Sequence, residues 1–339
     1  MGNIYGVDIG TSNFKMCCKD KSEILNEKNI IAIVNKKDLL AFGNEAYEMY
    51  EKAPENIEVS YPVKFGVIAD IENMQSLLEA FFNKINDDKK VSGNNDFYIA
   101  VPTDVTEVEK RAFYELVADS KVKAKNIYIV DKPVADAIGA GLDVTKSRGV
   151  MIVNIGAETT EISVLSLGGI VISKSVKIGG NKLDDSIIGH VRKVYNLIIG
   201  SKTAASLKIE LGSAIKSEEH FAPGFGRNVL SGLPVSVDIS SDVIHAAIID
   251  PLHSIMDSIK VILERTPPEL AADIIKNGIY VSGGTSNINN LEKFIQKETN
   301  INVNIVENPS ESVVRGLIGV VSNPEFANIP YTPQDKTYD

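Results

Sequence analysis

The feature that most constrains this chain is a strand–turn–strand pattern that occurs twice. Near the N-terminus an apolar run ends in Asp-Ile-Gly at residues 8–10 and is followed by a short polar turn and a second run. From Val150 the same order recurs, ending in Asn-Ile-Gly at residues 154–156. Each copy is predicted to form a β-hairpin. Because Asp8 and Asn154 lie 146 positions apart in a chain of 339 residues, we expect two related domains, each opening with the same hairpin.

Composition and charge exclude several classes of protein. The chain is 44% hydrophobic and 24% charged, as in globular proteins rather than disordered or fibrous ones. Its formal net charge of −10, with no block of Lys and Arg, disfavours nucleic acid as a partner. No apolar run approaches the ~18 residues of a spanning helix, and no secretory signal is found, so we expect a cytoplasmic protein. Cys17 and Cys18 are adjacent, which argues against a disulfide framework or a cysteine metal site.

Alternating strand and helix patterns predict that both halves are α/β. The small residues of the helix predicted over 133–142 suit close packing, and Leu183, Ile187, Val191 and Val194 recur at helical spacing. The pairs 184–185 and 218–219 are acidic and are interpreted as solvated faces. The predicted strands cover residues 97–102, 126–130, 235–239 and 278–284. Helices are predicted over 133–142, 183–195 and 241–264, and two more are predicted to begin at Thr106 and at Ile288. The segment 241–264 forms one or two helices capped by Ser240 or Ser241, and a break follows at residues 266–268.

Three glycine turns follow predicted strands, at residues 10–13, 156–159 and 283–286. We call them the first, second and third turn. Successive backbone N–H groups in such a turn form an anion-binding nest, and glycine allows close approach to phosphate oxygens. One such turn alone is most simply a hairpin, but two duplicated turns and a third at strand ends predict a phosphate site. The patterns of a P-loop and of a dinucleotide-binding Rossmann fold are both absent from the sequence.

Family-specific segments then occur in order along almost the whole chain. The chain resembles the superfamily of actin, sugar kinases and heat-shock ATPases, and within it is similar to the MreB/Mbl family of bacterial actins, as a divergent paralogue. The resemblance extends from Asp8 to about Val321. The segments that carry it are residues 8–13, 42–46, 64–70, 106–112, 137–142, 165–170, 195–200, 207–213 and 266–274.

This resemblance implies an α/β fold of the actin-like, ribonuclease H-like type, with duplicated domains around a nucleotide cleft and four subdomains. Domain I would comprise residues 1–146 and 310–330, with an outer subdomain over about 30–63. Domain II would comprise residues 147–309, with an outer subdomain over about 181–243. Residues 331–339 would form a flexible tail.

The resemblance also implies ATP with Mg²⁺ as cofactors. The first turn and the second turn would hold the β- and γ-phosphates, the third turn would lie beside the adenosine, and Asp8 would hold Mg²⁺ through water. Lys15 would reach phosphate from the first hairpin, and Lys208 would lie over the nucleoside, three residues after Ala205, where relatives usually have Glu. The implied binding residues are Thr11, Ser12, Asn13, Lys15, Gly156, Ala157, Glu158, Ala205, Ser206, Leu207, Lys208, Gly283, Gly284, Thr285 and Ser286.

The implied catalytic residues are Asp8, Asp131, Lys132 and Asn154, and two of them depart from the family pattern. Lys132 stands where the family has a Glu that activates water, and Asn154 replaces an Asp. A charged lysine only donates hydrogen bonds and Asn carries no charge, so we expect slow or absent ATP hydrolysis. Three alternatives stay open. Asp131 could rotate into the acceptor's place, and Lys132 could be a solvated loop residue or could neutralise phosphate charge. Asn154 could be no more than a turn residue. Glu158 would weaken binding by repelling phosphate.

By resemblance, the chain is a cytoskeletal protein that forms filaments organising cell-wall synthesis and rod cell shape. Its partners would be copies of itself in antiparallel double filaments, other MreB paralogues and cell-wall elongation proteins. The N-terminus leads directly into a strand and residues 86–96 are polar, so we expect the plasma membrane to be reached indirectly, through partners. The alternatives are a non-polymerising or regulatory paralogue, a small-molecule kinase, and a chaperone-type ATPase.

Overall fold

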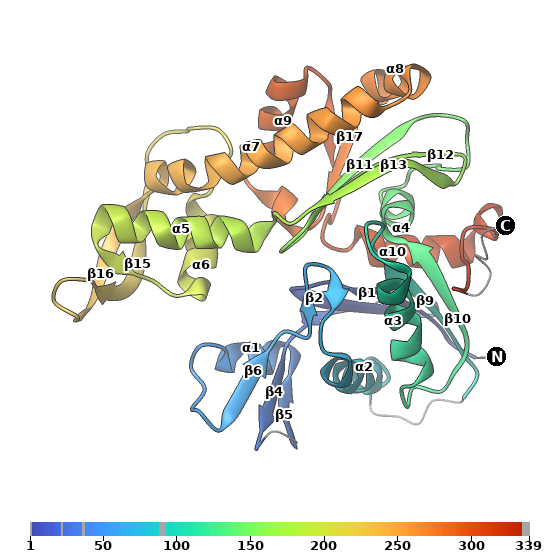
Figure 1. Cartoon of the computed structure of the whole chain (residues 1–339), viewed down its shortest axis with the longest axis horizontal. Coiled ribbons are helices and arrows are strands. Elements are labelled where there is room, and N and C mark those ends of the chain that lie inside the picture. Colours follow the sequence, from blue (N-terminus) through green and yellow to red (C-terminus); the bar gives the residue numbers. More distant parts are fainter. Residues whose placement is uncertain (1, 22, 36–37, 88–92, 334–339) are drawn as a thin grey trace. The chain divides into compact units, whose positions relative to one another are not determined.

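Figure 1 shows the computed structural model, which describes residues 2–21, 23–35, 38–87 and 93–333. The chain divides into two compact units. Unit 1 comprises the residues up to Ile152, Ser163–Ser173 and those from Ser310 on, and unit 2 comprises Val153–Ile162 and Lys174–Pro309. Of the predicted tail, residues 334–339 lie outside the described residues, whereas Tyr331 forms a backbone bridge with Ile129.

Unit 1 is built on a five-stranded sheet in the order β10-β9-β1-β2-β3. The first predicted hairpin is confirmed, because β1 and β2 pair in antiparallel register. Strands β9 and β10, which contain most of the predicted strands 97–102 and 126–130, pair in parallel, and β9 also pairs in parallel with β1. The bounds are β1 Ile4–Ile9, β2 Asn13–Cys18, β3 Ile24–Lys28, β9 Asn95–Val101 and β10 Ala124–Asp131.

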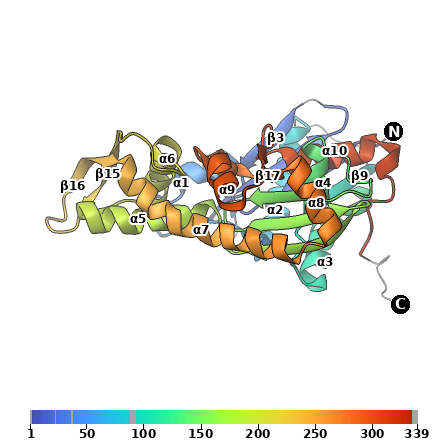
Figure 2. The same cartoon turned by 90° about the horizontal axis from the view of Figure 1, so that it is seen from above.

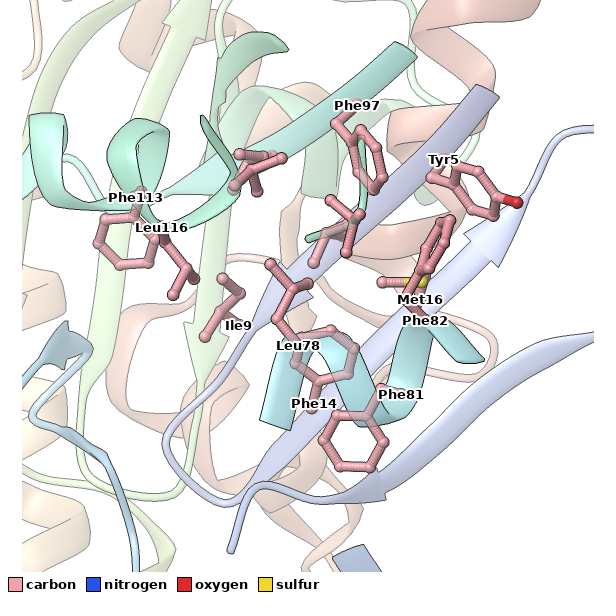
Figure 3. Close-up of a cluster of buried hydrophobic side chains, with 14 of the residues drawn as sticks. Tyr5, Ile9, Phe14, Met16, Leu78, Phe81, Phe82, Phe97, Phe113 and Leu116 are labelled. Atoms are coloured by element: carbon pink, nitrogen blue, oxygen red, sulfur yellow. The ribbon is translucent and has the colours of Figure 1, made fainter. Parts of the chain in front are cut away.

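One face of this sheet is covered by α2 (Ile71–Ile85) and α3 (Glu107–Ala118) and holds the main core of unit 1. Figure 3 shows its aromatic side chains, among them Phe14 and Phe81, whose stacked rings have centroids 4.6 Å apart. Thr106 caps α3, because its hydroxyl accepts from the N–H of Glu109 while the Glu109 carboxylate accepts from the N–H of Thr106. The predicted helix start is therefore confirmed.

The opposite face is covered by α4 (Lys132–Gly139) and α10 (Ser312–Ser322). Their backbones are in contact: a Cβ at Gly316 would lie 1.7 Å from Ala135 O, and one at Gly139 would lie 1.7 Å from Ser312 O. Only glycine fits at both positions, as the small-residue pattern of 133–142 predicted. The buried hydroxyl of Ser312 also donates to the buried Asp136 carboxylate between the two helices.

A second five-stranded sheet has the order β13-β12-β11-β17-β18, and the boundary between the units passes through β11, β12 and β13. Strands β11 and β12 are neighbours and Gly156 N donates to Thr159 O over 2.8 Å, so the second predicted hairpin is also confirmed. The bounds are β11 Val150–Ile155, β12 Thr160–Ser166, β13 Gly169–Val176, β17 Ile279–Ser282 and β18 Val303–Ile305.

The helices of unit 2 follow the predictions with local differences. The segment 241–264 forms one helix, α7, which contains Pro251 and runs beside α5 (Figure 2). Pro268 does not prolong the predicted break but begins α8, since the first turn of a helix needs no N–H donor there. The helix expected from Ile288 begins three residues later, at Leu291. The bounds are α5 Gly180–Tyr195, α6 Ser201–Leu211, α7 Ser241–Arg265, α8 Pro268–Asn277 and α9 Leu291–Thr299, with a 3₁₀ turn η1 at Gly284–Asn287.

The amphipathic pattern of α5 identifies the buried face but not its extent. Leu183, Ile187 and Val191 are fully buried, whereas Val194 in the last turn is 52% exposed. Periodicity gives the direction of a side chain and not the point at which the covering element ends. Across the described residues, no helix has both the length and the apolar character needed to cross a membrane.

Smaller sheets complete each unit. In unit 1, β5-β4-β6 packs with α1 (Gly43–Met49) around Ile30, Ala32, Ala41 and Ala46, and β7 pairs with β8. In unit 2, β14-β15-β16 lies against α5 and α6. The bounds are β4 Ile31–Val34, β5 Asp38–Phe42, β6 Ile57–Ser60, β7 Val63–Lys64, β8 Val67–Ile68, β14 Leu197–Ile198, β15 Phe221–Asn228 and β16 Pro234–Ser240; a 3₁₀ turn η2 covers Pro324–Phe326.

Candidate phosphate-binding site

The first turn is closed by Gly10 N, which donates to Asn13 O over 3.1 Å, and is clamped from behind by Asn29. The fully buried Asn29 donates from its backbone N–H to Ser12 O over 2.9 Å and from Nδ2 to Gly10 O over 2.8 Å. The hydroxyl of Thr11 accepts from Gly66 N over 3.2 Å. The turn is thus held in one shape by its own closing bond and by two neighbouring segments, those of Asn29 and Gly66. Sequence reasoning missed Asn29, which carries no local signal.

Strand alternation places the polar residues near the first turn on one face of the sheet. Phe14 and Met16 point into the core, so Asn13 and Lys15 point to the opposite face. Cross-strand register puts Asp8, Lys15 and Asn26 in one row, and Asn13 and Lys28 in the row beside it. The arrangement collects a carboxylate, two amides and two ammonium groups at the turn end of the sheet.

Three contacts connect these side chains. Lys15 Nζ donates to Asp8 Oδ2 over 3.0 Å, with only 11% and 5% of the two side chains exposed. Asn13 Nδ2 donates to Asn26 Oδ1 over 2.9 Å, and Lys28 Nζ donates to Ser12 Oγ over 3.2 Å. The predicted residues Asp8 and Lys15, which were expected to act separately, therefore form an ion pair.

Asp8 is held in its charged form. Burial opposes ionisation, but the charges of Lys15 and Lys132 and the hydrogen bond from Lys15 outweigh burial, so the pKa of Asp8 lies below its ordinary value. Lys132, the first residue of α4, is half-buried and its charge acts on Asp8. Asp131 precedes it as the helix N-cap, and its carboxylate accepts from the hydroxyl of Tyr331 over 2.8 Å.

In unit 2 the second turn meets the start of α5 and the third turn. Gly156 O accepts from Gly180 N over 3.0 Å and from Thr285 Oγ1 over 2.7 Å, and Ala157 O accepts from Asn181 N over 2.7 Å. Sequence elements 129 residues apart, at Gly156 and Thr285, are thereby joined by one hydrogen bond. The structure brings the second and third turns together.

Lys208 of α6 contacts the start of α5, beside the second turn. Its Nζ donates to Gly180 O over 2.9 Å and to the Asp184 carboxylate over 2.8 Å, with 14% and 13% of the two side chains exposed. The interpretation of Asp184 as a solvated residue is wrong, because this ion pair buries it, although Asp185 is exposed. The Gly-Gly pair at 179–180, before a helical pattern, is a signal that sequence reasoning overlooked.

The remaining candidates differ in exposure. Gly283 has φ +83°, and a Cβ there would lie 2.4 Å from Ile155 O, so only glycine allows the third turn to approach β11. Ser286 and Asn154 are buried, and Glu158 is half-buried in the second turn. On α6, Leu207 is buried in the core, Ala205 is half-buried, and Ser206 is exposed.

These groups fit a phosphorylated ligand. Each duplicated turn lies beside a lysine–aspartate pair with little exposed side-chain surface. A Cβ at Gly180 would lie 3.3 Å from Lys208 Nζ and 2.8 Å from Thr285 Oγ1. Such close contacts leave no room for a side chain at position 180. For Mg²⁺ the face around the first turn offers the Asp8 carboxylate, whose charge Lys15 already balances.

The duplicated hairpins, each in its own five-stranded sheet, are the arrangement expected of an actin-like protein, and comparison with known proteins gives the family. The MreB/Mbl protein family model matches residues 2–328. The cell shape-determining protein Mbl of Bacillus subtilis is 37% identical over 320 residues, covering 94% of this chain and 95% of Mbl. Solved structures of MreB5 of Spiroplasma citri, bound to ADP and to AMPPNP, match with TM-scores of 0.87 and 0.88 at 34% and 33% identity, covering 93% of this chain and 95% of theirs. The chain belongs to the MreB/Mbl family of actin-like cytoskeletal proteins.

Proposed function

We propose that this chain binds ATP and assembles into filaments that organise cell-wall synthesis and rod cell shape. The observation that carries the proposal is the pair of duplicated glycine turns, each accompanied by a lysine–aspartate pair whose side chains are at most 14% exposed, on a fold of the MreB/Mbl family. The name of Mbl states a role in cell shape, and MreB5 was solved with ADP and with AMPPNP bound.

In this proposal the first turn, Lys15 and the second turn bind phosphate, while the third turn and the segment 205–208 bind the nucleoside side. Backbone N–H groups and ammonium groups are the donors that phosphate oxygens require. Mg²⁺ accompanying ATP would be held through water by Asp8, and its chemistry is to neutralise phosphate charge. The domain division stated from the sequence, with outer subdomains over about 30–63 and 181–243, belongs to the same proposal.

Weak hydrolysis follows from the residues at the start of α4. A water molecule that attacks phosphorus must give its proton to an acceptor. Lys132 is donor-only when charged, Asp131 already accepts from Tyr331, and Asn154 carries no charge. In this proposal the chain therefore hydrolyses bound ATP slowly.

The hairpin of β15 and β16 is the proposed contact with a second copy. Its outward-facing apolar residues are Phe221, Phe225, Leu230 and Leu233, each more than half exposed. Phe221 and Phe225 share one face of β15, whereas Leu230 and Leu233 lie at the hairpin tip. Exposed apolar side chains that gather on one element of a monomer are typical of interaction sites. Other MreB paralogues and cell-wall elongation proteins are the further partners proposed, and they would bring this cytoplasmic protein to the plasma membrane. Residues 88–92 of the polar segment 86–96 lie outside the described residues.

Electron microscopy of the chain with ATP, with AMPPNP and without nucleotide tests the proposal. Filaments are expected with either nucleotide, and Leu230→Ser at the hairpin tip is expected to abolish them. Val108→Ser is the matched control, since Val108 is also about 80% exposed but lies on α3. Absence of filaments at saturating ATP would contradict polymerisation and favour a regulatory paralogue.

A further inference from the structure

We propose that Asn29 is a positioning residue for phosphate binding, which holds the first turn in the shape that an anion needs. It acts through the backbone of the turn and not through contact with the ligand, because its side chain is fully buried behind the turn. The inference rests on the proposed nucleotide binding and names the residue that prepares the first turn for it.

Asn29 contacts the two carbonyl groups of the turn that would otherwise oppose an anion. Its Nδ2 donates to Gly10 O over 2.8 Å, and its backbone N–H donates to Ser12 O over 2.9 Å. In a planar trans peptide, a C=O group and the N–H group of the next residue point in opposite directions. The N–H groups of Thr11 and Asn13 are therefore directed away from Asn29, while the two carbonyl oxygens, which repel phosphate, are directed toward it. A turn with its N–H groups directed outward can donate to an anion.

The backbone of Asn29 is fixed from its other side by the small core of unit 1. Asn29 lies between the end of β3 and the start of β4. The next residue, Ile30, is fully buried in the core that β4, β5 and α1 share, and its carbonyl oxygen accepts from Gly43 N over 3.0 Å. The Asn29 amide is thus held in place before any ligand binds, which lowers the ordering cost of binding.

The same carbonyl is held in the second turn by other elements. Gly156, which corresponds to Gly10 in the duplicated pattern, accepts through its carbonyl oxygen from Gly180 N over 3.0 Å and from Thr285 Oγ1 over 2.7 Å. Both turns therefore have this carbonyl tied to a neighbouring segment, although the donors differ in residue type and origin. Two independent solutions to one requirement indicate that the tie serves the turn itself.

Stability alone does not account for a buried amide at position 29. Asn29 Oδ1 is shielded from solvent and has no hydrogen-bond partner in the part of the chain that the structure describes. A buried acceptor without a donor destabilises the folded state. The Asn86 amide, by contrast, accepts from Tyr5 OH and donates to Phe82 O, each over 2.8 Å. Asn29 therefore lowers the free energy of unfolding relative to a fully bonded amide, which is typical of functional positions.

Amide hydrogen exchange of the ligand-free full chain tests the positioning, and calorimetric titration with inorganic tripolyphosphate tests its effect on binding. In Asn29→Ser the Gly10 amide, which closes the first turn, is expected to exchange about tenfold faster, while the Gly156 amide is unchanged. Tripolyphosphate should bind about three- to tenfold more weakly, the usual value of one hydrogen bond. Asn29→Leu retains the size of the side chain without its amide, and it should show the same two changes.

Asn86→Ser is the matched control. Asn86 is 5% exposed, and the change removes two hydrogen bonds of unit 1 beside Tyr5, at the end of β1 away from the first turn. It should destabilise the chain but leave Gly10 exchange and tripolyphosphate affinity at their wild-type values. An equal loss of affinity in Asn86→Ser and Asn29→Ser would assign the effect to general destabilisation and overturn the inference. Wild-type affinity in Asn29→Ser would overturn it as well.

A parallel titration with ATP separates the inference from the proposed function. Asn29-dependent binding of tripolyphosphate without binding of ATP would retain the positioning role and refute nucleotide binding. ATP binding that is equal in the wild type and in Asn29→Ser would retain the proposed function and refute the role of Asn29. Failure of the wild type to bind either ligand would refute both.

Discussion

The two halves of the chain carry the same strand–turn–strand unit, yet different elements supply the charges beside each turn. In unit 1 the buried pair Lys15–Asp8 joins the two strands of the hairpin itself. In unit 2 the pair Lys208–Asp184 comes from α6 and α5, outside the hairpin. The duplication therefore preserves the backbone turn, while each unit places a lysine–aspartate pair beside it in its own way.

The difference extends to the groups around each pair. Lys28 lies at the first turn, and the charge of Lys132 acts on Asp8. The hairpin of the second turn has the uncharged Asn154 and the acidic Glu158. In the proposed function, the first turn would therefore supply most of the attraction for phosphate, and the second would contribute mainly backbone donors.

The largest effect is expected from Lys15→Gln. It leaves the Asp8 carboxylate, which is only 5% exposed, without its partner, and we expect a loss of about 3 kcal/mol in the free energy of unfolding. Lys208→Gln should cost less, because the Asp184 side chain is 13% exposed. Urea unfolding measures the free energy of unfolding of both variants. Lys19→Gln is the control, because Lys19 is exposed and its replacement should change this free energy by less than about 0.5 kcal/mol. Equal values for Lys15 and Lys19 would refute the buried pair.

Acid should destabilise the first hairpin through Asp8. Its pKa is lowered in the folded state, so its contribution to stability is complete above the unfolded-state pKa of about 4 and is lost as pH falls through the lower folded pKa. Asp8→Asn removes this dependence. Its unfolding free energy should fall less than that of the wild type between about pH 5 and pH 2. Parallel pH curves for the two proteins would contradict the assignment.

Lys132→Glu should accelerate ATP hydrolysis about tenfold or more, because it replaces a donor with an acceptor at the start of α4. Lys132→Gln removes the same charge without supplying a base, and it should leave phosphate release near the wild-type rate. Steady-state phosphate release measures both. An equal acceleration by the two variants would attribute the effect to charge removal alone.

The smallest effect is expected at the second turn. Glu158→Gln removes a carboxylate from the turn that is proposed to bind phosphate, and a partly exposed charge of this kind changes affinity by about two- to fivefold. ATP binding should become tighter by that factor, as measured by fluorescence titration. Weaker binding by the variant would show that Glu158 supports the ligand rather than repelling it.

Features that depend on local pattern could be predicted from the sequence. Both hairpins, the cap at Thr106 and the small-residue helix of 133–142 follow from alternation, capping chemistry and residue size. The predicted residues of the second and third turns and Lys208 also meet in unit 2.

What the sequence did not reveal depends on register or on distant partners. Asp8 and Lys15 are seven positions apart and become neighbours only through the hairpin register. Asp184 is buried by a lysine 24 residues away, and Asn29 reaches the first turn from the loop after β3. The polarity of a single residue predicts none of these contacts, because each contact depends on which distant side chain the fold places beside that residue.

The most direct test of the account is the fate of the nucleotide during a single turnover. The full chain is mixed with less than stoichiometric radiolabelled ATP and Mg²⁺, and the bound nucleotide is separated and identified over time. We expect the label to remain in bound ATP for hours, with conversion accelerated by Lys132→Glu. Conversion to ADP within minutes in the wild-type chain, or failure to retain any nucleotide, would contradict the account.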